Sequence, residues 1–306
     1  PTQEVSHVVL HGGAQISTQA IAMCADKDIA VSWVTTGGRF VGTVAGGGGA
    51  QVQRKVRQYA ALADPETRLG LARRLVHAKV EGALRFVLRS TRGDEARDAA
   101  VNEALAGMRA GLRAIHKAED VTALLGHEGD SAARYFGLWN HLLVEGVDAR
   151  LHYTGRTRRP PKDRVSALLG FGYAMLLKDV TASLLAVGLE PALGFYHQPR
   201  SAAPALALDL MELFRVPVVD VAVLGSINRG QWDPDADFAV TGEKVWLSES
   251  GRRKFIEVYE RRRAEEWRHP VVGYSLSWAR TIELEARLLE KEWCGAPGLF
   301  ARFRLR

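Results

Sequence analysis

Two carboxylates interrupt a strongly apolar segment of the sequence, LALDLMELFR at residues 206–215. Asp209 and Glu212 are three residues apart, which places them on one face if the segment is a helix. Burying two carboxylates among leucine, methionine and phenylalanine side chains is costly unless a positive charge compensates them. A divalent metal ion provides that charge directly, so this pair is the first candidate for a catalytic site.

Two further residues could complete such a site. Glu128 follows an apolar turn and a glycine in LLGHEGDSAARYF, at the expected first turn of a helix. His197 lies between an aromatic pair and a proline in GFYHQPR, in a loop that we expect to join two helices. Each residue has a more common structural role, because an acid near a helix N-terminus complements the helix dipole and an isolated histidine is more often structural than a ligand.

Taken together, two carboxylates and an imidazole suit Mn²⁺ or Mg²⁺. Oxygen ligands favour these hard cations, and a single imidazole shifts the preference toward Mn²⁺. Three protein ligands leave positions for a phosphate oxygen and a water molecule, so the metal could polarise a phosphodiester and stabilise developing charge. The zinc-hydrolase motif HExxH is absent from the sequence.

Positive charge is concentrated in two parts of the chain. The net charge is +6, but residues 50–92 hold ten Lys or Arg against three Asp or Glu, so this segment carries +7 and the remainder −1. A second basic cluster spans residues 149–164 and contains Asp163 as its only acid. Clustered basic residues indicate a polyanionic partner such as nucleic acid, although the same charges could simply be solvated helix faces.

The elements that must position these residues fall into two classes. Short β-branched and aromatic runs with glycine turns predict strands within residues 5–44, with one short helix at 18–25. After the glycine run at 46–49, apolar residues recur at helical spacing. Helices are expected at residues 50–63, 66–92, 94–116, 128–143, 161–187, 203–223, 248–266 and 271–290, with a hairpin at 237–247. The predicted class is α+β: a small β-sandwich-like domain (1–49, including a glycine linker) followed by an all-helical catalytic domain (50–306).

Composition excludes several other classes of protein. With 306 residues, 47% apolar and 25% charged, the chain has ample material for a core. No uninterrupted apolar run is long enough to cross a membrane, and we expect no signal peptide. Two distant cysteines make no disulfide framework and no zinc cluster, so we expect a cytoplasmic protein. The glycine run lacks the Lys-Ser/Thr of a phosphate-binding loop, which favours a linker.

Five segments of the sequence, in order, resemble the CRISPR-associated integrases, also described as DNA endonucleases, which are the first-numbered core Cas proteins. No single string is decisive, but five in this order are strongly specific, and the likeness extends over nearly the whole chain. The segments are LLGHEGDSAARYF (124–136), RRPPKDRVSALLGFGYAML (158–176), VGLEPALGFYHQPR (187–200), ALALDLMELFR (205–215) and FAVTGEKVWLSESGRRKFIEVYERR (238–262).

The resemblance implies a dimer in which Glu128, His197 and Glu212 ligate the catalytic metal. Asp209 stands where the family often has a second acid, so it is either a ligand or a residue behind the ligands. Arg200 and Arg215 stand where basic residues often lie near the scissile phosphate, and both could neutralise phosphate charge. Together with the basic clusters, this predicts DNA contacts by Arg54, Arg57, Arg73, Arg74, Arg158, Arg159, Arg200 and Arg215.

The activity implied is CRISPR spacer acquisition, in which a protospacer 3′-hydroxyl attacks a phosphodiester at the border of a repeat. The implied partners are double-stranded DNA, a second copy of the chain and a small dimeric Cas protein, the second-numbered one. Two other functions stay open on the residues alone: a basic scaffold that binds branched DNA without chemistry, and a nuclease that uses water as the nucleophile.

The sequence also departs from the family pattern. Arg164, Ser166 and Gly170 replace the more usual proline, asparagine and serine, and Gln198 replaces a common acid. The strands that usually precede VVLHGG are missing and the chain begins at Pro1. We therefore expect it to be part of a longer polypeptide, because the family includes fusions to a Cas exonuclease, the fourth-numbered Cas protein, and to reverse transcriptases.

Overall fold

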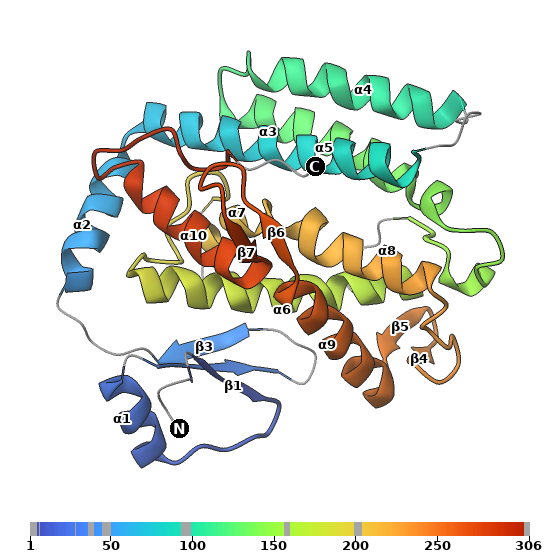
Figure 1. The fold of residues 1–306 in the computed structure, drawn as a ribbon, viewed down its shortest axis with the longest axis horizontal. Coiled ribbons are helices and arrows are strands. Elements are labelled where there is room, and N and C mark those ends of the chain that lie inside the picture. The colour runs from blue at the N-terminus through green and yellow to red at the C-terminus, as the bar shows by residue number, and fades with distance from the viewer. Residues whose placement is uncertain are drawn as a thin grey trace. The chain divides into compact units, whose positions relative to one another are not determined.

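The chain is mostly helical, with a small sheet near its N-terminus (Figure 1). The structure is a computed structural model that describes residues 5, 7–27, 29–35, 40–44, 50–92, 99–155, 160–198 and 204–302. The glycine run at 46–49 lies outside these residues. The α+β class predicted from the sequence is confirmed.

The N-terminal strands form one sheet in the order β1-β2-β3. Strand β1 (His7–His11) runs parallel to β2 (Ala30–Val34), and β3 (Phe40–Val44) runs antiparallel to β2. Helix α1 (Thr18–Asp26) connects the two parallel strands, and its first turn is capped by the side chain of Ser17. In the described residues this helix, and not a second sheet, packs on β2, with a core at Cys24, Ile29 and Val31.

The remaining helices of the described residues follow the sheet in chain order. They are α2 (Ala50–Ala63), α3 (Pro65–Ser90), α4 (Ala99–Ile115), α5 (Val121–Gly137), α6 (Arg164–Val187), α7 (Ala205–Met211), α8 (Val221–Asn228), α9 (Glu249–Ala264) and α10 (Trp278–Lys291). Short helical turns lie at Trp139–Leu142 (η2) and Ala149–Leu151 (η3). Helix α9 begins with an N-cap, because the Ser248 hydroxyl accepts a hydrogen bond from the backbone N–H of Gly251 at 3.1 Å.

The helical part also contains two short strand pairs, of which the first was predicted and the second was not. The predicted hairpin is confirmed as β4 (Phe238–Thr241) and β5 (Lys244–Leu247), turning through Gly242 at a φ of +59°. A second pair, β6 (Glu266–Arg268) and β7 (Ser275–Ser277), occupies residues where a helix was expected from 271. Pro270 and the positive φ of Gly273 delay the start of α10 to Trp278.

Two helix predictions that bear on the site are wrong. Helix α5 begins at Val121, because the side chain of Asp120 accepts a hydrogen bond from the backbone of Ala123 at 2.7 Å. Glu128 therefore lies in the middle of α5, and complementing the helix dipole does not explain it. The expected helix at 203–223 is interrupted after Met211 by a turn and a π-helix, η4 (Arg215–Asp220), which contains Pro217.

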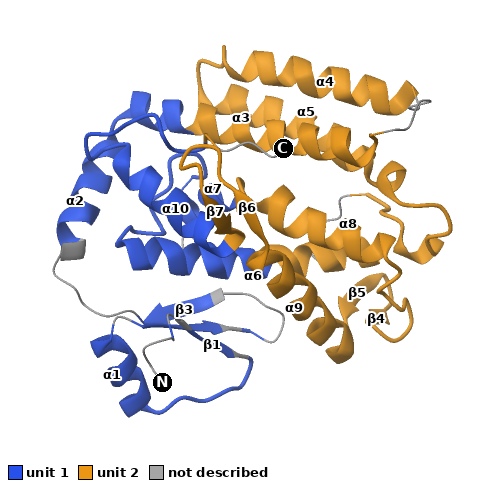
Figure 2. Ribbon diagram, in the orientation of Figure 1, with its two compact units in different colours: residues 1–71, 174–211, 279–301 blue, residues 72–173, 212–278, 302–306 orange. Residues whose placement is uncertain are grey.

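The chain divides into two compact units (Figure 2). Unit 1 comprises residues 1–71, 174–211 and 279–301, and unit 2 comprises residues 72–173, 212–278 and 302–306. His197 and Asp209 thus belong to unit 1, whereas Glu128 and Glu212 belong to unit 2. This division does not follow the expected boundary after residue 49, which falls outside the described residues and stays a prediction.

Apolar faces of helices supply the core of unit 2. On α3 the buried residues include Leu75, Val76, Val80, Leu84 and Val87, which recur at helical spacing as predicted. Helices α4 and α5 pack closely, since a side chain at Gly111 would come within 2.7 Å of the Ser131 hydroxyl. Among the described residues α6 is apolar and long enough to cross a membrane, but 56% of its apolar window is buried, as in a core helix.

Candidate metal centre

Two of the predicted acids meet at one ammonium group in unit 2. Lys79 from α3 forms ion pairs with Glu128 from α5 and with Glu212, which follows α7. Its Nζ lies 2.6 Å from Glu212 Oε2 and forms a short contact with Glu128 Oε1. The three side chains are 15%, 19% and 5% exposed for Lys79, Glu128 and Glu212 respectively. The fold therefore brings two carboxylates from distant segments around a single positive charge.

A second cation, Arg215, contacts the other carboxylate oxygen of Glu212. Arg215 Nη1 lies 3.4 Å from Glu212 Oε1, and the guanidinium stacks 4.5 Å from the centre of the Tyr173 ring. The Tyr173 hydroxyl donates a hydrogen bond to Asp220 at 2.7 Å, and the Tyr135 hydroxyl donates another at 2.8 Å. The carboxylate pair is thus backed by a buried polar network that extends through Arg215 to Asp220.

Asp220 is the titratable end of this network. Burial raises the pKa of its carboxyl from 3.8 to about 6, although the two tyrosine hydrogen bonds act in the opposite direction. The same burial, together with the nearby Asp220 charge, raises the pKa values of Tyr135 and Tyr173 well above the ordinary value. Ionisation of Asp220 therefore costs free energy in the folded protein, because the charged carboxylate is buried in the core.

We expect Asp220→Asn to flatten the pH dependence of stability. The folded protein binds this proton more tightly than the unfolded chain, so wild-type stability falls as pH rises from about 4 to about 6, by up to roughly 3 kcal/mol from this group. Urea unfolding across this pH range measures the effect. Asp130→Asn, at an exposed pair with Arg134, is the control, and an unaltered pH slope in Asp220→Asn would contradict the assignment.

The other two predicted residues meet in unit 1. The imidazole Nδ1 of His197 lies 2.6 Å from Asp209 Oδ1, and this oxygen also accepts the His197 backbone N–H at 2.8 Å. Asp209 Oδ2 accepts the backbone N–H groups of Phe195 and Tyr196 at 2.7 and 3.0 Å. Burial raises the pKa of the Asp209 carboxyl, while these hydrogen bonds oppose the shift. Asp209 thus fixes both the loop and the imidazole ring.

Close packing explains the glycine that opens this loop. A side chain at Gly194 would come within 2.7 Å of Asp209 Oδ2 and 2.8 Å of the Ala205 backbone.

The contact with Asp209 also decides which nitrogen of His197 is available to a metal. With Nδ1 protonated and donating to Asp209, the imidazole carries its lone pair on Nε2, which is the form that ligates metals. Asp209 lies on α7 and contacts the 195–197 loop, whereas Glu212 follows the end of α7 and contacts Lys79 and Arg215, so the two carboxylates have different partners.

The residue types of the predicted set suit a hard divalent cation, but its members do not form one cluster in the described residues. Glu128 and Glu212 supply oxygen donors that already surround a positive charge, and His197 is held as an oriented imidazole. Within the described residues no group of three or more His, Cys, Asp or Glu side chains lies close enough to hold a metal ion. The structure thus contains a carboxylate pair and an oriented histidine in separate units.

Several predicted DNA contacts make internal contacts instead of simply facing solvent. Arg54 pairs with Glu290 at 2.9 Å and donates to the Val187 carbonyl at 2.8 Å. Arg73 donates to the Ala118 carbonyl at 2.7 Å, and Arg74 is partly buried. Arg57 is exposed, with its guanidinium 3.8 Å from Cys294 Sγ. Arg158, Arg159 and Arg200 lie outside the described residues.

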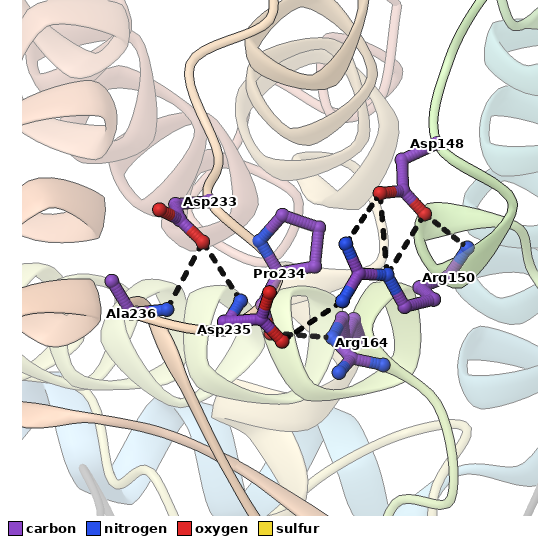
Figure 3. A network of polar contacts seen from close by, with 7 residues as sticks. All are labelled: Asp148, Arg150, Arg164, Asp233, Pro234, Asp235 and Ala236. Carbon is purple, nitrogen blue, oxygen red and sulfur yellow. Dashed lines mark hydrogen bonds and ion pairs between the residues drawn. The ribbon is translucent and has the colours of Figure 1, made fainter.

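The second basic cluster is partly neutralised by neighbouring acids (Figure 3). Arg150 is clamped between Asp148 and Asp235, with its nitrogens 2.7 and 2.8 Å from the two carboxylates. The hydrogen bonds from Arg150 hold the pKa of Asp148 down at about 2. Arg164 donates to the Pro234 carbonyl at 3.0 Å. These two arginines therefore hold segments of unit 2 together, a role that charge counting did not reveal.

Sequence reasoning missed the residues around the carboxylate pair. Lys79 is one of the ten basic residues counted in 50–92, and Asp220 lies within the segment 203–223 that was expected to be one helix. Tyr135 and Tyr173 lie in segments that were singled out for other reasons. A charged residue within an apolar run was the one available signal, because it requires a buried partner.

Comparisons with known proteins bear on this arrangement. The family model described as CRISPR associated protein Cas1 matches residues 1–261. A Cas4/Cas1 fusion described as a CRISPR-associated exonuclease and endonuclease, from Myxococcus xanthus, is 54% identical over the whole chain, which covers 54% of that protein. The chain thus spans about half the length of the first curated relatives that it matches.

A shorter relative and a solved structure agree with this match. The CRISPR-associated endonuclease Cas1 1 of Moorella thermoacetica is 33% identical over the whole chain, which covers 90% of that protein. A chain of a solved Cas6-RT-Cas1–Cas2 complex superposes with a TM-score of 0.81 at 23% identity, covering 98% of this chain and 32% of that one, which shows the shared fold. With the family model matched over 261 residues, the chain belongs to the Cas1 family of CRISPR-associated proteins.

Proposed function

We propose that this chain is a metal-dependent DNA integrase and endonuclease of CRISPR adaptation. The observation that carries the proposal is the convergence of Glu128 and Glu212 on one partly buried ammonium group, together with membership of the Cas1 family. The substrate class is double-stranded DNA, as protospacer and as CRISPR repeat. The reaction is a transesterification at phosphorus, so the protein must position two DNA segments and stabilise charge and needs no covalent intermediate.

Glu128, Glu212 and His197 would hold the divalent ion, Mn²⁺ or Mg²⁺, which when bound would polarise the phosphodiester and stabilise the developing negative charge. Asp209 orients the imidazole of His197 from behind, and it uses both of its oxygens for that purpose. Arg215 keeps a positive charge beside Glu212, fixed by the Tyr173 ring, where it can face a phosphate oxygen.

The bond changes balance without any additional reactant. The oxygen of a protospacer 3′-hydroxyl attacks phosphorus at the border of a repeat, and the bond from phosphorus to the 3′-oxygen of the target strand breaks. The attacking hydroxyl loses its proton, and the departing 3′-oxygen gains one. The number of phosphodiester bonds is unchanged, so the free energy of the step is close to balanced, and catalysis consists of positioning and charge stabilisation.

The proposed partners follow from the family and from the relatives. We infer a homodimer that binds DNA together with a Cas2 dimer, because a solved relative is named as a Cas1–Cas2 complex. We also infer linkage to a Cas4-type exonuclease, because the first matched relatives are Cas4/Cas1 fusions that are about twice as long as this chain. A cytoplasmic location agrees with the two free cysteines.

A strand-transfer assay tests the proposal against its two rivals. The full-length protein is incubated with its Cas2-type partner, Mn²⁺, labelled protospacer DNA and a plasmid that carries a repeat. Joined product supports integration. Cleavage of branched DNA without joining would instead support a nuclease that uses water, and a mobility shift without any reaction would support a scaffold.

Charge reversal on the first basic segment tests DNA binding. We expect Arg57→Glu, on the exposed face of α2, to weaken DNA binding and to reduce the slope of log affinity against log salt by about 1, because one phosphate contact is lost. Fluorescence anisotropy over a salt series measures the slope. Arg253→Glu, an exposed residue on α9, makes the same charge change as a control. Equal slopes for both variants would assign α2 to protein contacts or to solvation.

A further inference from the structure

The ammonium group of Lys79 lies where the two acidic side chains of the proposed metal site meet. It contacts Glu128 and Glu212 at once, although these residues are 49 and 133 positions away in the sequence. On α3 the neighbouring residues Leu75, Val76 and Val80 are buried, so core packing fixes the backbone position from which the Lys79 side chain extends. Lys79 itself is only 15% exposed.

The charges of this cluster balance without any metal. Glu128 and Glu212 contribute two negative charges, and Lys79 and Arg215 contribute two positive charges. A divalent cation added to these four mostly buried side chains would leave them with two excess positive charges, and the Asp220 carboxylate beyond Tyr173 offsets at most one of the two. Because like charges repel strongly where water is scarce, the favourable route is for the metal to take over the carboxylate oxygens that Lys79 contacts.

The chemistry of lysine fits such an exchange better than that of arginine. An ammonium group is a compact point charge on a flexible stem, so it can leave its partners without moving the backbone. Arg215 is fixed by stacking on Tyr173, and it contacts the oxygen of Glu212 that Lys79 does not. Lys79 is therefore the more exchangeable of the two cations around Glu212.

We propose that Lys79 is a resident cation that holds Glu128 and Glu212 together in the metal-free protein and is displaced when the divalent ion binds. Lys79 is then a positioning residue that also competes with the metal. This inference rests on the proposed function, since it requires that these two carboxylates ligate the metal. It predicts that Lys79 lowers the affinity of the protein for the divalent ion.

The test measures Mn²⁺ binding to the full-length protein by isothermal titration calorimetry and by the electron paramagnetic resonance of free Mn²⁺, at fixed pH and ionic strength. We expect Lys79→Met to bind Mn²⁺ at least tenfold more tightly than the wild type, and Lys79→Arg, whose guanidinium is harder to displace, to bind it more weakly than the wild type. Lys254→Met is the matched control, because Lys254 forms an ion pair with the buried Asp237, and its Mn²⁺ affinity should not change.

Thermal unfolding gives a second readout that does not depend on activity. Lys79→Met should melt at a lower temperature than the wild type without metal, and Mn²⁺ should raise its melting temperature by more than it raises that of the wild type. If Lys79→Met fails to fold, Lys79→Gln, which keeps a hydrogen-bond donor, is used in the same way. An unchanged or weaker Mn²⁺ affinity in these variants overturns the inference.

The proposed metal site and the resident-cation role of Lys79 can be rejected separately. Glu128→Gln and Glu212→Gln should both lose Mn²⁺ binding. If both retain it, the proposed metal site is wrong and the role of Lys79 is overturned with it. If both lose it while the Lys79 variants bind Mn²⁺ as the wild type does, the metal site stands and only the resident-cation role is rejected.

Discussion

Replacing Glu212 or Glu128 by glutamine should reduce strand transfer by about a thousandfold or more while DNA affinity stays near that of the wild type. Glutamine keeps the volume and the hydrogen-bonding capacity of glutamate but removes the charge that a divalent ion requires. Losses of two to three orders of magnitude follow the removal of a single group that stabilises charge in a transition state, and loss of a metal ligand should be at least as large. His197→Ala should have a similar effect.

The measurement is the initial rate of joined product in Mn²⁺, with DNA affinity determined separately by anisotropy. Glu249→Gln is the matched control, because Glu249 forms an exposed ion pair with Arg253 on α9 and makes the same chemical change. It should leave the rate unchanged. Strand transfer that survives at more than a tenth of the wild-type rate in Glu212→Gln or Glu128→Gln would remove that residue from the metal set.

Asp209→Asn is expected to have the largest effect on stability, with a loss of about 3 kcal/mol in the free energy of unfolding. The carboxylate accepts four hydrogen bonds from the 195–197 loop, three from backbone N–H groups and one from the His197 ring. An asparagine side chain offers only one acceptor oxygen, so its amide group would face N–H donors in a fully buried position. Strand transfer should also fall by about 10- to 100-fold, because the imidazole loses its orientation.

Urea unfolding of the wild type and the variant at pH 7 measures the change. Asp130→Asn is again a suitable control, since Asp130 is 55% exposed in its pair with Arg134 and should alter stability by less than about 1 kcal/mol. A loss below about 1 kcal/mol in Asp209→Asn would mean that the loop does not depend on this carboxylate. A stability loss without any effect on strand transfer would separate the structural role from the orientation of His197.

Much of the fold follows from local patterns in the sequence. The strands expected within residues 5–44 and the hairpin expected at 237–247 were predicted from β-branched and aromatic runs and from turn residues, and both are present. The wrong helix limits lie where a continuous apolar periodicity gave no sign of the residue at which one helix ends or another begins. Asp120 starts α5 earlier than expected, and the segment around Pro217 forms a π-helix between two shorter helices.

The residue types alone determined which chemistry this chain could support: two acids in apolar surroundings and one histidine, a set that suits a hard cation and a phosphodiester. Tertiary structure decided what each residue does. It placed Asp209 behind His197 and turned Glu212 toward Glu128, and it put Lys79 between the two glutamates. The physical reason is that secondary-structure periodicity reports only neighbours within a few residues, whereas a buried charge is compensated by whichever distant side chain the packing of the core brings within a few ångströms.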